Sequence, residues 1–494
     1  MATINKNFRK LAAGYLFPEI ARRANAYQKE NPDKVLHRLG IGNTTEALSS
    51  TIVEALHRKI DLLANNATYS GYGDEQGDEP LREAIVNYYK SMGISLERDE
   101  VFVSDGAKPD AANLQSLFAL DNIVAIQDPA YPVYVDSNVV AGRSSGFDSA
   151  LGEYKNLVYL PGTEENGFFP PPPQQKVDLI YLCSPNNPTG AVATHKQLQQ
   201  YVDYAKKHKA VIIFDAAYAE FITDTTLPKS IFQIEGAKEC AIEINSFSKF
   251  SGFTGVRLGW SIVPKELVVE DSQPQEINKM WFRRQVTFFN GASNIAQAGG
   301  IAVLSEEGLK ESRSLIAYYM KNAAIIKEAL EEMGLTVYGG TNAPYLWVKT
   351  PNNLDSWDFF DQLLNQCQVI TTPGGGFGKA GKNFIRISAF GHKENIEKAI
   401  PSFINVSFIF LKEDQAILDK ALLEACEDIK KQDALYTTSM EDWERFKTAL
   451  RLLKTKAQII SVGSGIKKMC QIVLAHYQDN NQESSNRQDA TPSG

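Results

Sequence analysis

The sequence predicts an α/β fold: a mainly parallel sheet with helices on both faces, a smaller α+β domain, and a C-terminal helical extension. Between about residues 80 and 265, short apolar runs alternate with helix-like segments. This alternation is typical of parallel strands joined by helical crossovers. From about residue 290 to 403 the pattern changes to longer helices with a few strands. A chain of 494 residues is long enough for two or three such domains.

The elements follow in order from the N-terminus. Residues 1–45 are expected to form an N-terminal arm and part of the small domain. The large domain is expected at 46–288, with helices such as 80–92 and 195–208 between its strands. Its strands are expected where β-rich apolar runs occur, at 101–103, 123–126, 179–182, 211–214, 241–244 and 258–262.

The small domain is expected at 289–403, and the sequence pattern changes again after it. Residues 404–478 are helix-like, with apolar residues recurring at three- and four-residue spacing. Residues 479–494 are rich in Asn, Gln and Ser, which predicts a disordered tail. Three roles stay open for the extension: a partner-binding or oligomerisation module, a regulatory lid, or an inert appendage. The strands of the small domain are expected at 336–338, 346–348 and 385–388.

Composition excludes several classes of protein. A net charge of -8 without a polybasic stripe argues against nucleic acid or an anionic membrane surface as the main partner. Five scattered cysteines, none in a CxxC pair, argue against disulfides and zinc, and six histidines show no metal spacing. The N-terminus has no apolar signal core, and the longest apolar stretch, at 403–411, is too short to span a bilayer. We therefore expect a cytoplasmic protein without a metal.

One loop places a lysine among serines, glycines and an arginine. Ser246 and Ser248 precede Lys249, and Arg257 follows eight residues later. An amine can hold an aldehyde covalently, while hydroxyls, backbone N–H groups and a guanidinium can bind a phosphate. Pyridoxal phosphate (PLP) carries both groups, so we expect Lys249 to link it and to move the proton at the substrate Cα. A surface lysine in a Ser/Gly loop is the plain alternative, which the clustering disfavours.

Polar motifs follow five of the predicted strands, at the strand ends where ligands bind in open α/β sheets. Asp215 could keep the pyridine nitrogen of PLP protonated, and Tyr218 could bond the phenolate oxygen. Taken alone, Asp215 could also cap a helix starting at Ala216. Asn187 could donate to the same phenolate oxygen or belong to an ordinary turn. Tyr131 could stack on the pyridine ring or be a packed loop tyrosine.

Arg386 lies in a β-alternating, mostly apolar segment. A charge there is costly without an anion, and a substrate α-carboxylate is a natural partner for a bidentate guanidinium. The alternative is a structural ion pair with a nearby acid. The glycine-rich segment 374–378 is not followed by an obvious helix, so a tight turn before this strand is a sufficient explanation.

The ordered set of motifs resembles the fold type I, aspartate aminotransferase-like PLP enzymes over about residues 1–403. The set comprises Asn-Pro-Thr-Gly at Asn187, Asp215 with Tyr218, Ser-x-Ser-Lys ending at Lys249, and the two arginines. Within that family, five further motifs resemble the LL-diaminopimelate aminotransferases. They are centred on Tyr15, Tyr72, Lys108, Asn290 and Arg386. The resemblance implies the three-layer PLP-dependent transferase fold, and the segment after residue 403 has no counterpart in it.

The resemblance also implies roles for residues. Lys249, Asp215 and Tyr218 would be catalytic. The cofactor would contact Tyr72, Ala107, Lys108, Tyr131, Asn187, Asp215, Tyr218, Ser246, Ser248, Lys249, Arg257 and Asn290. The substrate would contact Tyr15, Gly42, Glu75, Lys108, Tyr131, Asn187, Asn290 and Arg386.

Two of these assignments shape the rest. Arg386 would take the α-carboxylate, while Tyr15, Glu75 and Asn290 would bind the distal amino and carboxylate ends. Tyr72 would reach the phosphate from the partner subunit, which requires a homodimer with shared active sites. The residues after Lys108 differ from the usual sequence of the family at this point. The difference affects the start of the helix but leaves Ala107 and Lys108 in place.

The implied reaction is ping-pong transamination between LL-2,6-diaminopimelate or tetrahydrodipicolinate and 2-oxoglutarate or glutamate. It would serve the biosynthesis of lysine and peptidoglycan precursors. One alternative is an aminotransferase of the same fold for aspartate or an aromatic amino acid. Another is a PLP-binding regulator or scaffold acting through the C-terminal helices.

Overall fold

The computed structural model describes residues 1–12, 16–40 and 42–407. Residues 1–327 and 337–397 form one compact unit, and residues 328–336 group with 398–494 in a second unit. Of the second unit, the described part is residues 328–336, which include the end of α10 (Glu306–Glu332), and residues 398–407 at the end of α12 (Lys393–Ser407). Almost all of the expected extension at 404–478, and the expected tail at 479–494, lie outside the described residues.

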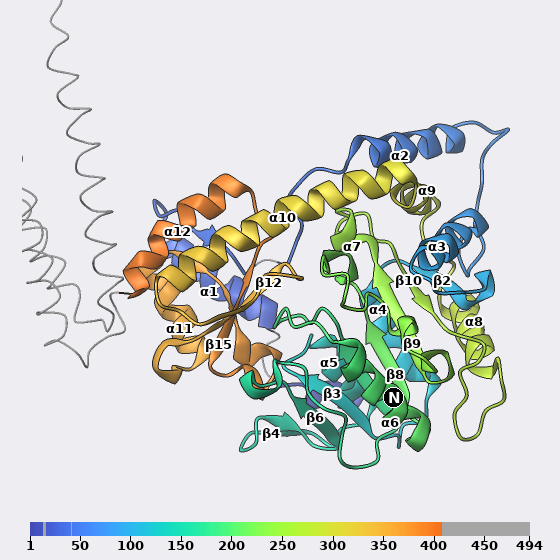
Figure 1. The fold of residues 1–494 in the computed structure, drawn as a ribbon, viewed down its shortest axis with the longest axis horizontal. Coiled ribbons are helices and arrows are strands. Elements are labelled where there is room, and N and C mark those ends of the chain that lie inside the picture. The colour runs from blue at the N-terminus through green and yellow to red at the C-terminus, as the bar shows by residue number, and fades with distance from the viewer. Residues whose placement is uncertain (13–15, 41, 408–494) are drawn as a thin grey trace, which may run out of the picture. The chain divides into compact units, whose positions relative to one another are not determined.

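A seven-stranded sheet is the centre of the first unit (Figure 1). Its order is β2-β10-β9-β8-β7-β3-β6. The neighbours from β9 to β6 run parallel, and β10 runs antiparallel to both β2 and β9. The strands are β2 (Val101–Ser104), β3 (Val124–Asp128), β6 (Leu157–Pro161), β7 (Leu179–Cys183), β8 (Val211–Asp215), β9 (Ala241–Ser246) and β10 (Gly259–Ile262).

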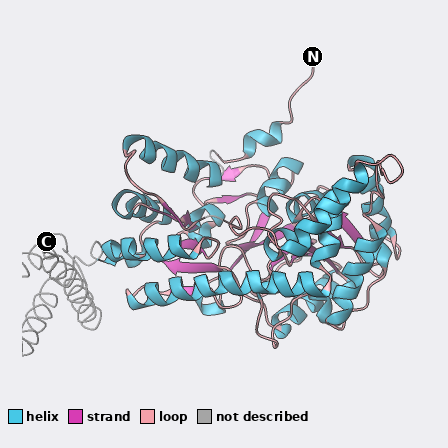
Figure 2. Cartoon of the chain, turned by 90° about the horizontal axis from the view of Figure 1, so that it is seen from above, coloured by secondary structure: helices cyan, strands magenta, loops and turns pink. Residues whose placement is uncertain are grey.

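All six strands predicted for this sheet are confirmed, and β6 is an addition. Both faces of the sheet are buried, which explains the continuous apolar runs. In β8, Val211 and Ile213 pack with the cluster that includes α4, α5 and α8, whereas Ile212 and Phe214 pack with α6. Figure 2 shows the strands enclosed by helices. The covering helices are α4 (Ala107–Asn113), α5 (Val133–Ala141), α6 (His195–His208) and α8 (Glu276–Phe288).

The helix predicted at 195–208 begins and ends as expected, and local chemistry explains why. Thr194 is the N-cap of α6, and its Oγ1 accepts a hydrogen bond from the N–H of Gln197 at 3.2 Å. The Gln197 side chain in turn accepts from the N–H of Thr194, which completes a capping box. Lys209 then ends the helix in the left-handed conformation. The helix predicted at 80–92 is also confirmed, as α3 (Glu79–Ser91).

A second, antiparallel sheet forms the smaller domain, in the order β11-β12-β15-β14. The three strands predicted here are confirmed, and β14 is an addition. β1 (His37–Arg38) pairs with β13 (Val369–Ile370), which joins the N-terminal segment to residues of the smaller domain. The four strands are β11 (Val337–Gly339), β12 (Tyr345–Lys349), β14 (Thr372–Pro373) and β15 (Phe384–Ser388).

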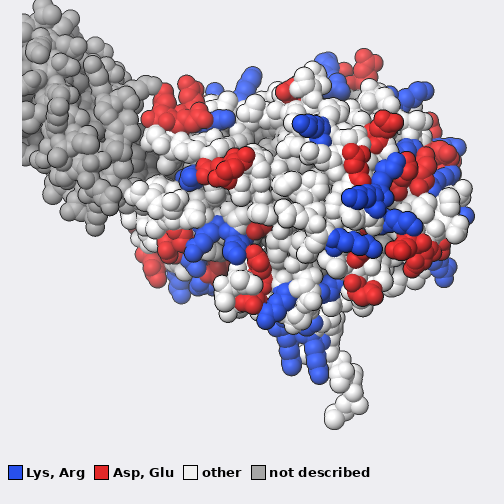
Figure 3. Space-filling model, turned by 60° about the horizontal axis from the view of Figure 1, so that its bottom comes forward, with Lys and Arg blue, Asp and Glu red and all other residues white. Residues whose placement is uncertain are grey.

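Two negative observations concern the described residues. None of their helices is long and apolar enough to cross a membrane. No group of three or more of their His, Cys, Asp and Glu side chains could hold a metal ion. Acidic and basic side chains are both spread over the face shown in Figure 3, as the modest net charge of -8 suggests.

Candidate active site

A cavity of about 370 Å³ lies at the carboxyl ends of β7, β8 and β9. It also receives residues from the smaller domain, so both sheets contribute to it. Twelve residues predicted for the site line this cavity: Gly42, Ala107, Lys108, Tyr131, Asn187, Asp215, Tyr218, Ser246, Ser248, Lys249, Arg257 and Arg386.

Three other predicted residues do not line it. Tyr72 and Asn290 are exposed and Glu75 is half-buried. The fourth, Tyr15, lies outside the described residues. A Cβ on Gly291 would contact the carbonyl oxygen of Asp74 at 3.0 Å, so the segments that carry Glu75 and Asn290 touch each other. These residues therefore form a separate surface of the same chain.

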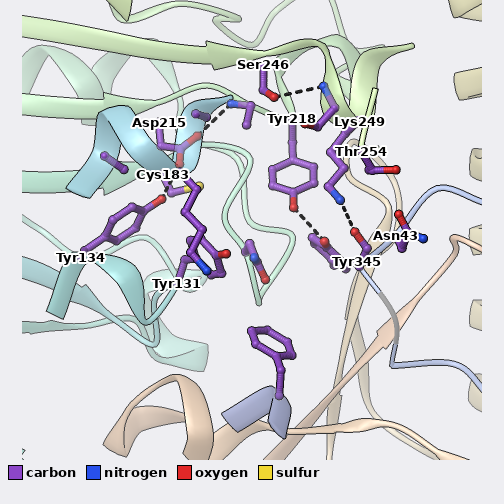
Figure 4. A pocket seen from close by; sticks show the side chains of 18 of the residues that line it. Asn43, Tyr131, Tyr134, Cys183, Asp215, Tyr218, Ser246, Lys249, Thr254 and Tyr345 are labelled. Atoms are coloured by element: carbon purple, nitrogen blue, oxygen red, sulfur yellow. Dashed lines mark hydrogen bonds between the residues drawn. The ribbon is translucent and has the colours of Figure 1, made fainter. Parts of the chain in front are cut away.

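Lys249 is held on the short helix α7 (Phe247–Phe250) directly after β9. Ser246 caps this helix, because its Oγ accepts a hydrogen bond from the N–H of Ser248 at 3.0 Å. The ε-amine donates to the carbonyl oxygen of Gly42 (Figure 4). Burial, reinforced by the positive charges of Arg386 and Arg257, lowers the pKa of Lys249 from 10.5 to about 7. The amine is therefore neutral, and nucleophilic, to a large extent near neutral pH.

Arg257 completes a cradle for an anion beside this lysine. Its Nη1 donates to Ser248 Oγ at 3.3 Å and to the carbonyl oxygen of Thr254 at 3.1 Å. Gly106 has φ +127°, and a Cβ there would collide with Nη2 of Arg257. Because Gly106 has no side chain, the guanidinium of Arg257 has room next to the start of α4. Backbone N–H groups at a helix start have no partner within the helix, so Ala107 and Lys108 can add donors for a phosphate.

Asp215 ends β8 and is held from two sides. The Tyr134 hydroxyl donates to Oδ2 at 2.6 Å, and the N–H of Ala217 donates to Oδ1 at 3.0 Å. Burial raises the pKa of Asp215, and these two hydrogen bonds act in the opposite direction. The alternative of a helix cap is wrong, since no helix starts at Ala216; the next is the short 3₁₀ helix Ala219–Phe221.

Arg386 lies on β15 and is only 1% exposed. Its Nη1 donates to Oδ1 of Asn187 at 2.6 Å, and its Nη2 donates to the carbonyl oxygen of Gly40 at 2.8 Å. Nε is buried and has no hydrogen-bond partner among the described residues. No acidic side chain of the described residues forms an ion pair with Arg386, so the alternative of a structural ion pair fails within this part of the chain. The guanidinium keeps its charge for a ligand.

Asn187 is oriented by the same contact. A guanidinium can only donate, so the amide oxygen of Asn187 must face Arg386. The amide nitrogen then faces away from Arg386. This is the orientation that a donor to a phenolate oxygen requires. Tyr131 lies nearby, in an edge contact with Tyr134 at 6.0 Å between ring centroids and with Lys108 Nζ at 5.6 Å from its ring centroid.

The charges of the cavity favour anions strongly. Among the described residues that line it, four side chains are basic and only Asp215 is acidic. The basic residues are Lys108, Lys249, Arg257 and Arg386. A phosphate dianion and a carboxylate would balance this excess. The residues present therefore fit PLP together with an amino acid.

Sequence reasoning missed several residues of the cavity. Tyr134 and Tyr345 are buried and bond to predicted residues, Asp215 and Tyr218 respectively. Phe17 and Cys183 also line the cavity. Tyr134, three residues after Tyr131, carried a weak helical-spacing signal. Tyr345 carried none, because the contact spans 127 positions of sequence.

Comparison with known proteins gives this cavity a context. Residues 34–403 match the family of class I and II aminotransferases. The chain belongs to this family. Its members use PLP, and the cradle around Lys249 and Arg257 is where the cofactor fits. When bound, PLP withdraws electrons from the substrate Cα and carries the amino group between two substrates.

Several solved structures are similar over most of the chain. The LL-diaminopimelate aminotransferase of Chlamydomonas reinhardtii is 47% identical, with a TM-score of 0.78, over 82% of this chain and 98% of that one. Substrate-bound BacF of Bacillus subtilis is 27% identical, with a TM-score of 0.70, over 82% and 98%. The aspartate aminotransferase of Thermus thermophilus, at 21% identity and a TM-score of 0.70, shares the fold. The fold type I aminotransferase fold predicted from the motifs is confirmed.

Proposed function

We propose that this aminotransferase transfers amino groups between LL-2,6-diaminopimelate or tetrahydrodipicolinate and 2-oxoglutarate or glutamate. The reaction would belong to the biosynthesis of lysine and peptidoglycan precursors. The observation that carries the substrate assignment is the 47% identity to an LL-diaminopimelate aminotransferase over 82% of the chain. A cavity with one unpaired buried arginine and an additional lysine, Lys108, supports a substrate with more than one carboxylate.

The residues of this chain have distinct tasks in the proposal. Arg386 binds the α-carboxylate as a fork and so orients the Cα–H bond. Lys249 removes the proton from Cα and gives it up again later in the same half-reaction, which suits an amine with a pKa of about 7. Asp215, which accepts hydrogen bonds from Tyr134 and Ala217, keeps a proton on the ring nitrogen of the cofactor.

The distal end of the substrate is assigned to the separate surface that carries Glu75 and Asn290. We infer that this surface completes the cavity of a second copy, together with Tyr72, in a homodimer. Glu75 would pair with the distal ammonium of the diamino acid. The proposed domain boundaries remain 1–45, 46–288 and 289–403.

A spectroscopic titration tests the proposed function. The purified protein should show a visible band of bound cofactor, and Lys249→Ala should lack it. LL-diaminopimelate should shift the band, and 2-oxoglutarate should then restore it while glutamate forms. A band that responds to aspartate or phenylalanine but not to LL-diaminopimelate would reject this substrate in favour of another amino acid. Binding without turnover would favour a regulator.

A further inference from the structure

Tyr345 is a buried tyrosine next to the carboxylate-binding arginine. It starts β12, where it pairs with Ser388 of β15. Arg386 lies two positions before Ser388 on the same strand. Diagonal neighbours of this kind project from the same face of a sheet. The guanidinium carbon of Arg386 lies 4.4 Å from the centroid of the Tyr345 ring, within the range of a cation–π contact. Tyr345 is 1% exposed.

The hydroxyl of Tyr345 reaches the other side of the cavity. It lies 2.8 Å from the hydroxyl of Tyr218, which follows β8 of the large sheet (Figure 4). Each hydroxyl has one proton to donate. If Tyr218 donates its proton to the phenolate oxygen of the cofactor, the proton between the two tyrosines must come from Tyr345. The hydrogen bond therefore has one direction in the loaded enzyme.

The surroundings hold Tyr345 in this position. A Cβ on Gly42 would come within 3.0 Å of its hydroxyl, so the absence of a side chain at Gly42 leaves the space that the phenol occupies. The ring also meets Phe390 edge-on, at 6.0 Å and 85°. Its backbone carbonyl accepts from the N–H of Gly340 at 2.8 Å. The phenol has little freedom to turn away from Tyr218.

We propose that Tyr345 is a positioning residue that couples the carboxylate-binding Arg386 to the cofactor-side Tyr218. Its ring supports the guanidinium, and its hydroxyl donates to Tyr218 and so makes Tyr218 a stronger donor to the cofactor. Hydrogen bonds in such a chain polarise one another. The inference rests on the proposed roles of Tyr218 and Arg386, and it does not depend on which amino acid is the substrate.

Two substitutions separate the two tasks in the holoenzyme. Tyr345→Phe keeps the ring and removes the hydroxyl. We expect it to raise the pH midpoint of the visible cofactor band by about 0.3 to 1 unit, because a weaker Tyr218 donor stabilises the phenolate less. The dissociation constant of 2-oxoglutarate should change less than about twofold. Tyr345→Leu also removes the ring, and should weaken 2-oxoglutarate binding about three- to tenfold.

A double substitution decides whether the effect passes through Tyr218. If it does, Tyr218→Phe with Tyr345→Phe should have the same midpoint as Tyr218→Phe alone. Shifts that add would overturn the proposal, as would an unchanged midpoint in Tyr345→Phe. Tyr201→Phe is the matched control. It removes a buried hydroxyl that bonds the carbonyls of Pro170 and Pro171 far from the cavity, and it should leave the midpoint unchanged.

These readouts also distinguish this inference from the proposed function. The band and its midpoint are measured without LL-diaminopimelate. A coupled pair of tyrosines in a protein that ignores LL-diaminopimelate would reject the substrate and retain the role of Tyr345. If LL-diaminopimelate turns over but the midpoint shifts of the two tyrosine substitutions add, the substrate is retained and the role of Tyr345 is rejected. The other charged side chains that line the cavity among the described residues, Lys108, Arg257, Arg386 and Asp215, are unchanged in every variant.

Discussion

The chemistry of Lys249 follows from where its amine is placed. Burial disfavours its charged form, and two guanidinium groups in the same cavity add to the effect. The same two groups, Arg257 and Arg386, are the ones expected to bind the phosphate and the carboxylate. The charges that attract both ligands thus also make the lysine a nucleophile.

Trace acetylation of the apoprotein should reveal this neutral lysine. Acetic anhydride reacts only with the unprotonated amine, so reactivity follows the pKa. From about pH 5 to about pH 10, labelling of Lys249 should rise and level off above a midpoint near 7, whereas labelling of an ordinary exposed amine keeps rising over this whole range. Peptide mass spectrometry measures both in one sample. A Lys249 profile that coincides with that of the exposed lysines would contradict the assigned environment.

Arg386 should not tolerate replacement by lysine. An ammonium cannot form the planar fork that holds a carboxylate and also reach Asn187 and Gly40. We expect Arg386→Lys to lower kcat/KM by about 10²- to 10³-fold, as the loss of charged hydrogen bonds implies.

The matched control for that substitution is Arg143→Lys. Arg143 is also buried, but its Nη2 donates to the carbonyls of Gln115, Phe118 and Ala119, and it does not line the active-site cavity. It should lower the thermal midpoint and leave KM unchanged. Equal kinetic losses in the two variants would mean that Arg386 acts through stability.

The predictability of single residues depended on local pattern. Lys249, its two serines and Arg257 lie within twelve positions of sequence, so their joint chemistry was visible without a structure. The hydrogen bond between Tyr134 and Asp215 joins residues 81 positions apart, and that between Tyr345 and Tyr218 joins residues 127 positions apart. Nothing in the local sequence indicates either contact. The first contact is set by the packing of α5 on the large sheet, and the second by how the two sheets meet.

Among the elements, the segment between β14 and β15 links the two domains at the cavity. The N–H of Ala130, after β3, donates to the carbonyl of Phe377 at 2.9 Å. The N–H of Ala380 donates to Asp128 Oδ2 at 3.1 Å. Gly378 has φ +142°, and a Cβ there would collide with Asp128 Oδ1. Since the Phe377 ring centroid lies 5.0 Å from the guanidinium carbon of Arg386, this docking also shapes the surroundings of Arg386, the proposed carboxylate-binding residue.

Asp128→Asn should change how stability depends on pH. Burial raises the pKa of Asp128 from 3.8 to about 7, so the folded protein binds more protons than the unfolded chain between these values. The contribution of Asp128 to stability therefore falls as pH rises from about 4 to about 7. Asparagine resembles the protonated acid and avoids this loss. The stability advantage of the variant should therefore grow as pH rises, and should be larger at pH about 8 than at pH about 5 by on the order of a few kcal/mol.

Thermal midpoints at both pH values measure the effect. Asp203→Asn removes the same charge from the exposed side of α6, and should shift both midpoints by less than about a degree. An Asp128→Asn effect of equal size at both pH values would show that titration of this carboxyl is not its cause.

Element prediction was most secure where burial was complete, and it missed two strands that carry a weak pattern. β8 and β9 are buried along their whole length, and their β-branched runs left no other interpretation. β6 is an edge strand with a mixed burial pattern, and β14 contains only two residues. Neither carries a period-2 signal long enough to recognise. The antiparallel direction of β10 could not be read either, because its connection is a loop motif that also builds the site.

At the scale of the whole molecule, the chain presents two separate sets of predicted site residues. One set lines the cavity. The other lies on a surface defined by α2 (Ser50–Leu63), residues 69–75 and residues 288–291. Lys59 Nζ of α2 donates to Ser70 Oγ at 3.4 Å, which joins the first two of these segments. This surface is rich in exposed apolar side chains: Val53, Ile60, Leu62, Tyr69, Tyr72 and Phe288.

Exposed apolar side chains in such numbers are typical of an interface. Tyr72 is 89% exposed in the isolated chain, which leaves its proposed contact with the phosphate to a neighbouring copy. In a two-fold dimer each copy would lend this surface to the cavity of the other. The active site would then be complete only in the dimer.

Mixing two defective variants tests this arrangement. Lys249→Ala lacks the linking amine, and Tyr72→Ala with Glu75→Gln lacks the lent residues, so each homodimer should be nearly inactive. If sites are shared, a mixed dimer has one cavity with both Lys249 and an intact lent surface. Random assortment then restores roughly a quarter of native activity. If each cavity uses its own Tyr72 and Glu75, every cavity keeps one defect and the mixture stays inactive. Native protein taken through the same unfolding and refolding gives the reference activity, and size-exclusion chromatography shows whether mixed dimers have formed.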